Sequence, residues 1–236
     1  MKITRPPSSK PGQNFEKFIL RFIDDFETEF SEGNFDNRYF PSFKWFEKSV
    51  GKIDNVINFG CSHGRETFAL AWRFGVIEAM GIDKNSKRIK VANDYVRLIS
   101  NFNEQFPNYL RKLPLEYAEK IRKWYEEKFE LKEAILPIFR QRDLINGLDS
   151  DSNSFDLAYS RYVVDKIEEK ARLGVIEEMG RIVKSGGNLI IVGPDKILPD
   201  DFAIPGFHII NKVDKDSLGL QEDSDTNPKG FLLIKQ

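Results

Sequence analysis

The chain has 236 residues, of which 40% are hydrophobic and 31% are charged, which suits a globular α/β domain with a sizeable core. Its 36 basic and 37 acidic side chains leave a net charge of −1, so no overall positive charge attracts nucleic acid or an anionic membrane. The single cysteine, Cys61, excludes an intrachain disulfide and a multi-cysteine zinc site. The single cysteine and the absence of an apolar signal-peptide run predict a cytoplasmic location.

The N-terminal part is expected to form an extension to the main domain. Residues 1–12 are basic and proline-rich and are interpreted as a short disordered lead. Phenylalanines recur at helical spacing over residues 15–30, which predicts an amphipathic helix that packs an aromatic stripe on the main domain. A second helix is expected over residues 41–50, because Pro41 suits a first helical turn. We therefore divide the chain into an extension, 1–50, and a domain, 51–236.

From residue 53 the pattern alternates between strands and helices. Buried strands are predicted at residues 53–59 and 77–82, and helices at residues 65–74 and 86–99. This alternation predicts an α/β fold with a mostly parallel, Rossmann-like sheet and right-handed crossovers.

Residues 101–133 interrupt the alternation. They are charged and helical in pattern, so a helical insertion between the second and third strands is expected. Its charged faces are either solvated or cover a ligand cleft.

The alternation then resumes to the end of the chain. A third strand is expected near residues 134–140 and a fourth at 155–160, followed by a helix over 164–183. Gly186 and Gly187 are expected to turn the chain into a fifth strand at 188–192. Two closing strands are predicted at 207–213 and 231–235, with a polar loop over 214–229 between them.

The most informative stretch runs from Val56 to Gly64, an apolar strand followed by a glycine turn and a helix. Ligands of such sheets bind beyond the carboxyl ends of the strands. Gly60 and Gly64 lack side chains where a backbone must approach a ligand. The helix start offers free N–H groups that suit a methionine carboxylate or a phosphate.

A carboxylate at the end of the next strand supplies the second part of the pattern. Asp83 follows Gly64 by 19 positions, where a carboxylate can accept both hydroxyls of a ribose. We expect Asp83 to have little part in folding, because it ends a strand at the mouth of the site. The dinucleotide fingerprint G-x-G-x-x-G fails, since Ser62 and Arg65 stand at its second and third glycine positions. The two parts predict an adenosine-containing cofactor other than NAD.

The pattern resembles the first motif of class I S-adenosylmethionine-dependent methyltransferases, acidic-x-Gly-x-Gly-x-Gly, with Asn58 for the acidic residue and Ser62 for the middle glycine. Asp143 stands where these enzymes often place a polar residue against the adenine. Residues 181–187, Arg-Ile-Val-Lys-Ser-Gly-Gly, are similar to their helix–Lys-Pro-Gly-Gly–strand signature. The resemblance implies the cofactor S-adenosylmethionine. It assigns cofactor binding to Asn58, Gly60, Cys61, Ser62, Gly64, Glu66, Asp83, Lys84, Asp143, Leu144 and Ser160.

One subgroup, the chemotaxis-receptor glutamate methyltransferases, is more similar still. Their loop reads Gly-Cys-Ser-Thr-Gly-Glu-Glu, and residues 60–66 read Gly-Cys-Ser-His-Gly-Arg-Glu. Their fourth strand, Phe-Asp-x-Ile-Phe-Cys-Arg-Asn-Val, resembles residues 155–163, in which Tyr162 replaces the asparagine. Their N-terminal helical domain does not fit before residue 53. Glu66 is interpreted either as a ligand of the methionine ammonium or as a residue that stabilises the helix start.

Arg161 and Tyr162 leave the fourth strand toward the transferable methyl group and are the candidate catalytic residues. The cation of Arg161 suits a small or protein-borne acidic acceptor, whose identity the sequence does not give. No metal site, membrane contact or nucleic-acid partner is expected, and the oligomeric state stays open. Two alternatives stand beside this interpretation: a non-catalytic scaffold with the same fold and an NAD-dependent oxidoreductase.

Overall fold

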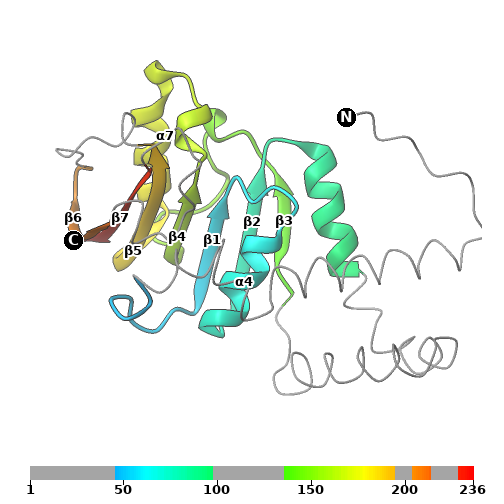
Figure 1. The fold of residues 1–236 in the computed structure, drawn as a ribbon, viewed down its shortest axis with the longest axis horizontal. Helices are drawn as coiled ribbons and strands as arrows, with labels where there is room; N and C mark the ends of the chain where they lie inside the picture. Colours follow the sequence, from blue (N-terminus) through cyan, green and yellow to red (C-terminus); the bar gives the residue numbers. More distant parts are fainter. Residues whose placement is uncertain (1–45, 98–135, 195–203, 214–227) are drawn as a thin grey trace, which may run out of the picture.

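A seven-stranded sheet in the order β3-β2-β1-β4-β5-β7-β6 forms the centre of the computed structural model (Figure 1). The structure describes residues 46–97, 136–194, 204–213 and 228–236. The expected helices at 15–30 and 101–133, the lead at 1–12 and most of the 214–229 loop lie outside these residues. So does the first half of the 41–50 helix, residues 41–45, and in its described half residues 46 and 47 are helical.

The strands of the sheet are close to those expected. Neighbouring strands are parallel, except that β7 is antiparallel to both β5 and β6. The Rossmann-like, mostly parallel sheet predicted from the sequence is therefore confirmed. The strands are β1 (Asn55–Phe59), β2 (Glu78–Asp83), β3 (Ile138–Gln141), β4 (Phe155–Arg161), β5 (Val183–Pro194), β6 (Phe207–Val213) and β7 (Pro228–Lys235).

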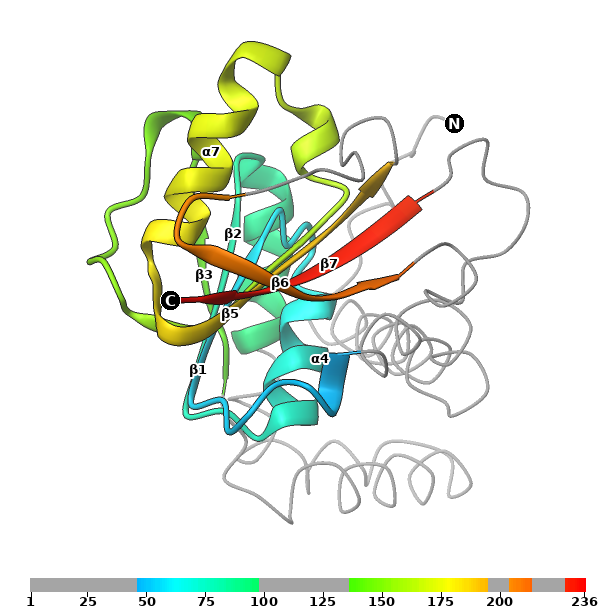
Figure 2. The same cartoon turned by 90° about the vertical axis from the view of Figure 1, so that its left-hand side faces the viewer.

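Helices cover both faces of the sheet (Figure 2). Helix α4 (Arg65–Phe74) lies on one face and helix α7 (Glu169–Arg181) on the other. A further helix begins at Ser86 and continues at least to residue 97. The start and end of α4 agree with the sequence prediction, because Gly64 and Gly75 flank it in left-handed conformations.

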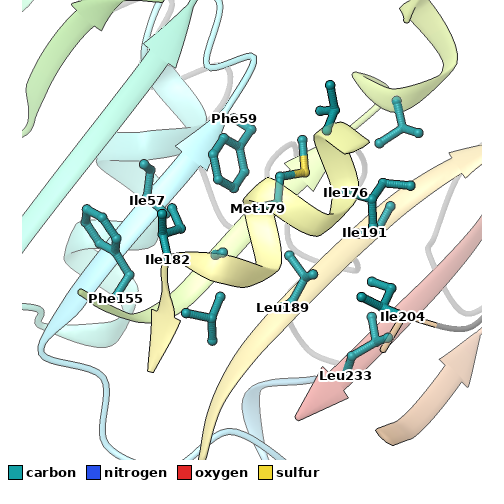
Figure 3. Packing of buried hydrophobic residues seen from close by; sticks show 14 of the residues in the cluster. Ile57, Phe59, Phe155, Ile176, Met179, Ile182, Leu189, Ile191, Ile204 and Leu233 are labelled. Atoms are coloured by element: carbon teal, nitrogen blue, oxygen red, sulfur yellow. The ribbon is translucent and has the colours of Figure 1, made fainter. Parts of the chain in front are cut away.

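Two apolar clusters fill the space between the sheet and its helices. On the α7 side, Met179 and Ile176 pack among Phe59, Ile191 and Leu233 of the sheet (Figure 3). On the α4 side, a second cluster joins Leu70 of α4 to Val56, Tyr159 and Ile190 of the sheet. Strands covered on both faces need apolar side chains at successive positions, which accounts for the continuous apolar runs in the sequence.

The helix expected over residues 164–183 is interrupted, so this prediction was wrong in its first part. A 3-10 helix, η3 (Val164–Lys166), comes first, and Ile167 and Glu168 are extended before α7 begins. Val164 and Ile167 are both buried in the α7-side cluster. Burying these two side chains against the sheet outweighs the helical pattern of the segment.

The Gly186-Gly187 pair lies within β5 rather than before it, because β5 begins at Val183. The β4–β5 register shifts between Phe155, which pairs with Val183, and Leu157, which pairs with Asn188. A Cβ on Gly187 would lie 2.9 Å from the carbonyl oxygen of Lys184. The glycines therefore allow an irregular stretch of strand instead of a turn into it.

Gly81 on β2 provides a test of this packing, because three elements meet at its α-carbon. A Cβ there would lie 2.6 Å from the Phe139 ring of β3 and 2.8 Å from Thr67 Oγ1 of α4. We predict that Gly81→Ala lowers the free energy of unfolding by about 1–3 kcal/mol through overpacking. Chemical denaturation would measure the change.

Gly174 offers a matched control in the exposed part of α7, where a Cβ would meet nothing within 4 Å. Gly174→Ala should raise stability by about 0.5–1 kcal/mol, because alanine is the better helix former. Equal effects of the two substitutions would contradict the packing at Gly81.

Candidate active site

The site lies at the carboxyl edge of the sheet, between β1 and β4. After β1 the chain continues outward through β2 and β3, and it then returns to β4 on the other side of β1. Strand order reverses at this point, and parallel sheets place ligand crevices there. The loop from Gly60 to Gly64 begins at the end of β1, and Arg161 and Tyr162 stand at the end of β4.

The loop after β1 has an unusual backbone. Gly60, Ser62 and Gly64 have φ angles of 65°, 52° and 85°, in the left-handed region that favours glycine. A Cβ on Gly60 would lie 2.3 Å from Val163 Cγ2, and one on Gly64 would lie 2.5 Å from Phe139 Cζ. The glycines are thus required by neighbouring protein side chains, a requirement that the sequence reasoning, which considered only a ligand, did not foresee.

Asp83 holds this loop in place. Its Oδ2 accepts a hydrogen bond from the Ser62 N–H at 3.0 Å, and its Oδ1 accepts one from the Asn85 N–H at 2.8 Å. The residue is 7% exposed. A carboxylate has about four acceptor positions, so capacity for two ribose hydroxyls remains. Because Asp83 fixes the loop, the expectation that it has little part in folding was wrong.

A pocket beside β2, here called the β2 pocket, contains several residues selected from the sequence. They are Gly60, Asp83, Lys84, Asp143, Leu144 and Tyr162. Asp143 begins the 3-10 helix η2 (Leu144–Asn146), and its Oδ1 accepts a hydrogen bond from the Ile145 N–H at 3.2 Å.

Sequence reasoning missed other residues that line the β2 pocket. Ile145, Val163 and Ile167 supply apolar surface, and Arg88, Arg142 and Lys166 supply positive charge. Ile145 is 52% exposed, so its side chain is accessible to a ligand in the pocket. The signal that could have found these residues is their position soon after β3 or β4 or, for Arg88, in the helix that follows β2.

A second pocket, here called the loop pocket, adjoins the first. It is lined by Gly60, Cys61, Ser62, His63, Glu66, Arg161 and Tyr162, so Gly60 and Tyr162 belong to both pockets. His63 lines this pocket but was not among the site residues selected from the sequence. Burial raises the pKa of the Cys61 thiol, so Cys61 stays protonated and is no thiolate nucleophile.

Glu66 and Arg161 form an ion pair in the loop pocket. Arg161 Nη1 lies 3.5 Å from Glu66 Oε1, and each side chain is 14% exposed. Burial raises the pKa of Glu66, while the Arg161 charge and hydrogen bonds from Tyr159 and Asn58 act in the opposite direction. The Arg161 guanidinium also lies 5.6 Å from the centre of the Tyr162 ring, a distance typical of a cation–π contact.

Tyr162 has a strained backbone at the junction of the two pockets. Its φ angle is 52°, a conformation costly for a residue with a bulky side chain. Its N–H donates to the Val192 carbonyl at 2.8 Å, which holds this conformation. Burial raises the pKa of its hydroxyl, so Tyr162 is a neutral phenol at physiological pH.

Three of the selected residues do not line either pocket. Asn58 is fully buried, and its Nδ2 donates to Thr67 Oγ1 at 3.1 Å. Ser160 is also fully buried, and its hydroxyl has no partner within the described part of the chain. Gly64 shapes the backbone of the loop behind the loop pocket. These three residues therefore contribute to the structure around the site and do not line the pockets themselves.

The described residues include no group of three or more His, Cys, Asp or Glu side chains placed to hold a metal ion. None of the helices described is long and apolar enough to cross a membrane.

Comparisons with known proteins agree with this architecture. A family model described as a methyltransferase domain matches residues 101–191. No curated protein matches the chain.

Among solved structures, a TehB-like S-adenosylmethionine-dependent methyltransferase from Corynebacterium glutamicum is 14% identical, with a TM-score of 0.53 over 96% of this chain and 100% of its own. The N-methyltransferase NodS from Bradyrhizobium japonicum, solved with S-adenosylhomocysteine, is 14% identical, with a TM-score of 0.53 over 86% and 87%. An S-adenosylmethionine-dependent methyltransferase from Aquifex aeolicus is 14% identical, with a TM-score of 0.52 over 97% and 100%.

At these identities the solved structures show the fold, which is that of class I methyltransferases. The family match adds a methyltransferase domain within it. The chain therefore has the class I methyltransferase fold, and its residues 101–191 are similar to a methyltransferase domain.

Proposed function

We propose that S-adenosylmethionine lies across both pockets, with its nucleoside in the β2 pocket and its methionine part in the loop pocket. The observation that carries this proposal is that the two pockets adjoin at Gly60 and Tyr162, beside the β1–β4 reversal. The sulfonium would then lie near Tyr162, where the carboxyl end of β4 meets the glycine loop.

The β2 pocket offers partners for each part of the nucleoside. Asp83 is proposed to accept the ribose hydroxyls with the acceptor positions that Ser62 and Asn85 leave open. Asp143 is proposed to accept the exocyclic amine of the adenine. Ile145 and Val163 supply the apolar surface against which a purine ring packs.

The loop pocket offers partners for both charges of the methionine part. Helix α4 begins at Arg65, and Gly64 before it provides no side-chain cap, so the first N–H groups of the helix suit the carboxylate. Glu66 is the only carboxylate that lines the loop pocket within the described residues, and it is proposed to bind the ammonium.

The acceptor is proposed to be a small or protein-borne acidic group. An acceptor oxygen would attack the methyl carbon in line, and the C–S bond would break with its electron pair passing to sulfur, which leaves S-adenosylhomocysteine. A carboxylate nucleophile needs no base, whereas an amine or a hydroxyl does. Arg161 lines the loop pocket, and a guanidinium can grip a carboxylate at two oxygens.

The same acceptor class is supported by the loop sequence. Gly60-Cys61-Ser62 and the later Gly64 and Glu66 match the loop of chemotaxis-receptor glutamate methyltransferases, whose acceptor is a carboxylate. We propose a shared acceptor chemistry, without a receptor as the substrate.

The role of Asp83 can be tested by a pair of substitutions. Asp83→Ala should weaken S-adenosylhomocysteine binding by about 1.5–3 kcal/mol, the scale of a hydrogen bond to a charged group. It should also lower the free energy of unfolding, because the Ser62 and Asn85 N–H groups lose their acceptor. Calorimetric titration and chemical denaturation would measure the two effects.

Asp156 provides the matched control at the opposite edge of the sheet. Its Oδ2 also accepts two backbone N–H groups, those of Asp54 and Asn55, at 2.9 and 2.8 Å. Asp156→Ala should therefore lower stability and leave S-adenosylhomocysteine affinity unchanged. Unchanged affinity in a folded Asp83→Ala protein would refute the ribose assignment.

Arg161 is proposed to bind the acceptor and not the cofactor, so a substitution there should change turnover and leave cofactor affinity intact. Arg161→Ala should abolish most methyl transfer in a screen of acidic acceptors and keep S-adenosylhomocysteine binding. Arg161→Lys should restore turnover only partly, because lysine lacks the planar fork. Full activity of Arg161→Ala would remove the residue from the mechanism.

A further inference from the structure

The ion pair between Glu66 and Arg161 creates a competition within the loop pocket. Glu66 is the only carboxylate lining this pocket among the described residues, and Arg161 already faces it at 3.5 Å. The methionine ammonium of the cofactor, placed in this pocket by the proposed function, brings a second cation to the same carboxylate.

We propose that the cofactor ammonium displaces Arg161 from Glu66, and that the displaced guanidinium then binds the carboxylate of the acceptor. Cofactor binding would thereby prepare the acceptor site, and the acceptor would bind second. This inference rests on the proposed function, because it takes S-adenosylmethionine as the occupant of the loop pocket.

The geometry favours an exchange of partners. The contact is a single pairing of Nη1 with Oε1 at 3.5 Å, longer than the usual 2.7–2.9 Å of a strong charged hydrogen bond. Both side chains are only 14% exposed, so water replaces a lost partner poorly and another ion replaces it better. The ammonium supplies one for Glu66, and an acidic acceptor supplies one for Arg161.

The charges of the methyl donor also favour binding of an anionic acceptor after the cofactor. S-adenosylmethionine carries a sulfonium in addition to its ammonium and carboxylate, so it adds one net positive charge to the neutral Glu66–Arg161 pair. An anionic acceptor neutralises this charge. After transfer, the acceptor is a neutral ester and S-adenosylhomocysteine has no sulfonium, so the attraction between the bound molecules is lost.

Acetate is a carboxylate that can replace the unidentified acceptor as a probe for the displaced Arg161 guanidinium. We would titrate the full chain with S-adenosylhomocysteine in about 200 mM acetate, and in acetamide at matched ionic strength as the uncharged control. Acetate should tighten S-adenosylhomocysteine binding by about three- to fivefold relative to acetamide, because an anion that binds only the complex stabilises it by linkage. Arg161→Met should abolish this effect.

A second ligand isolates the ammonium. 5′-Methylthioadenosine has the nucleoside and sulfur of the cofactor but no amino-acid part, so it leaves Arg161 on Glu66. Acetate should not change its affinity for the wild-type protein.

The wild-type titrations alone decide the matter, even if Arg161→Met fails to fold. Weaker S-adenosylhomocysteine binding in acetate would show that acetate competes with the methionine carboxylate for Arg161, which overturns the inference. No effect of acetate would overturn it as well. Absence of S-adenosylhomocysteine binding in every buffer would instead contradict the cofactor placement itself, and the inference with it.

Discussion

The carboxylate of Asp83 is the contact on which the geometry of the site depends. It ends β2, and its two oxygens hold the Ser62 N–H in the loop after β1 and the Asn85 N–H at the start of the next helix. Gly60, Ser62 and Gly64 of this loop have left-handed backbone conformations. If Asp83 were removed, the loop would have to keep them without this buried hydrogen-bond acceptor. One side chain therefore joins β1, β2 and the following helix at the edge where both pockets open.

Two departures from the class I motif have a physical explanation in this arrangement. Asn58 stands where the motif has an acidic residue, and the carboxyl of Glu66 from α4 faces its amide. An acidic residue at position 58 would place a second carboxylate beside Glu66 in a buried site, and neighbouring like charges disfavour ionisation. The middle glycine is replaced by Ser62, whose left-handed backbone is held by the bond to Asp83.

Much of the fold could be predicted from the sequence, because its central strands are covered on both faces and helix α4 is flanked by glycines. The bounds of α4 follow from Gly64 and Gly75, and the alternation of strands and helices dictates a parallel sheet. The break before α7 could not be predicted, because it arises from burial of Val164 and Ile167 against distant strands. The lining residues Ile145 and Val163 were missed for a similar reason, since only the folded sheet brings them beside Asp83.

The positions of several site residues could be predicted from the sequence, but their structural contacts could not. Gly60 was selected as a loop glycine, but its closeness to Val163 joins segments about 100 residues apart and has no trace in local sequence. Arg161 was selected for its place after the fourth strand, and its pairing with Glu66 depends on how α4 lies on the sheet. Local patterns thus locate the edge of the sheet that carries the site, while partners across the sheet come from tertiary packing.

The two adjoining pockets are proposed to hold S-adenosylmethionine rather than a dinucleotide. Calorimetric titration of the full chain with S-adenosylhomocysteine and with NAD, under identical conditions, tests this proposal most directly. Binding of S-adenosylhomocysteine should be saturable, and binding of NAD should be much weaker or absent. Tighter binding of NAD than of S-adenosylhomocysteine would contradict it.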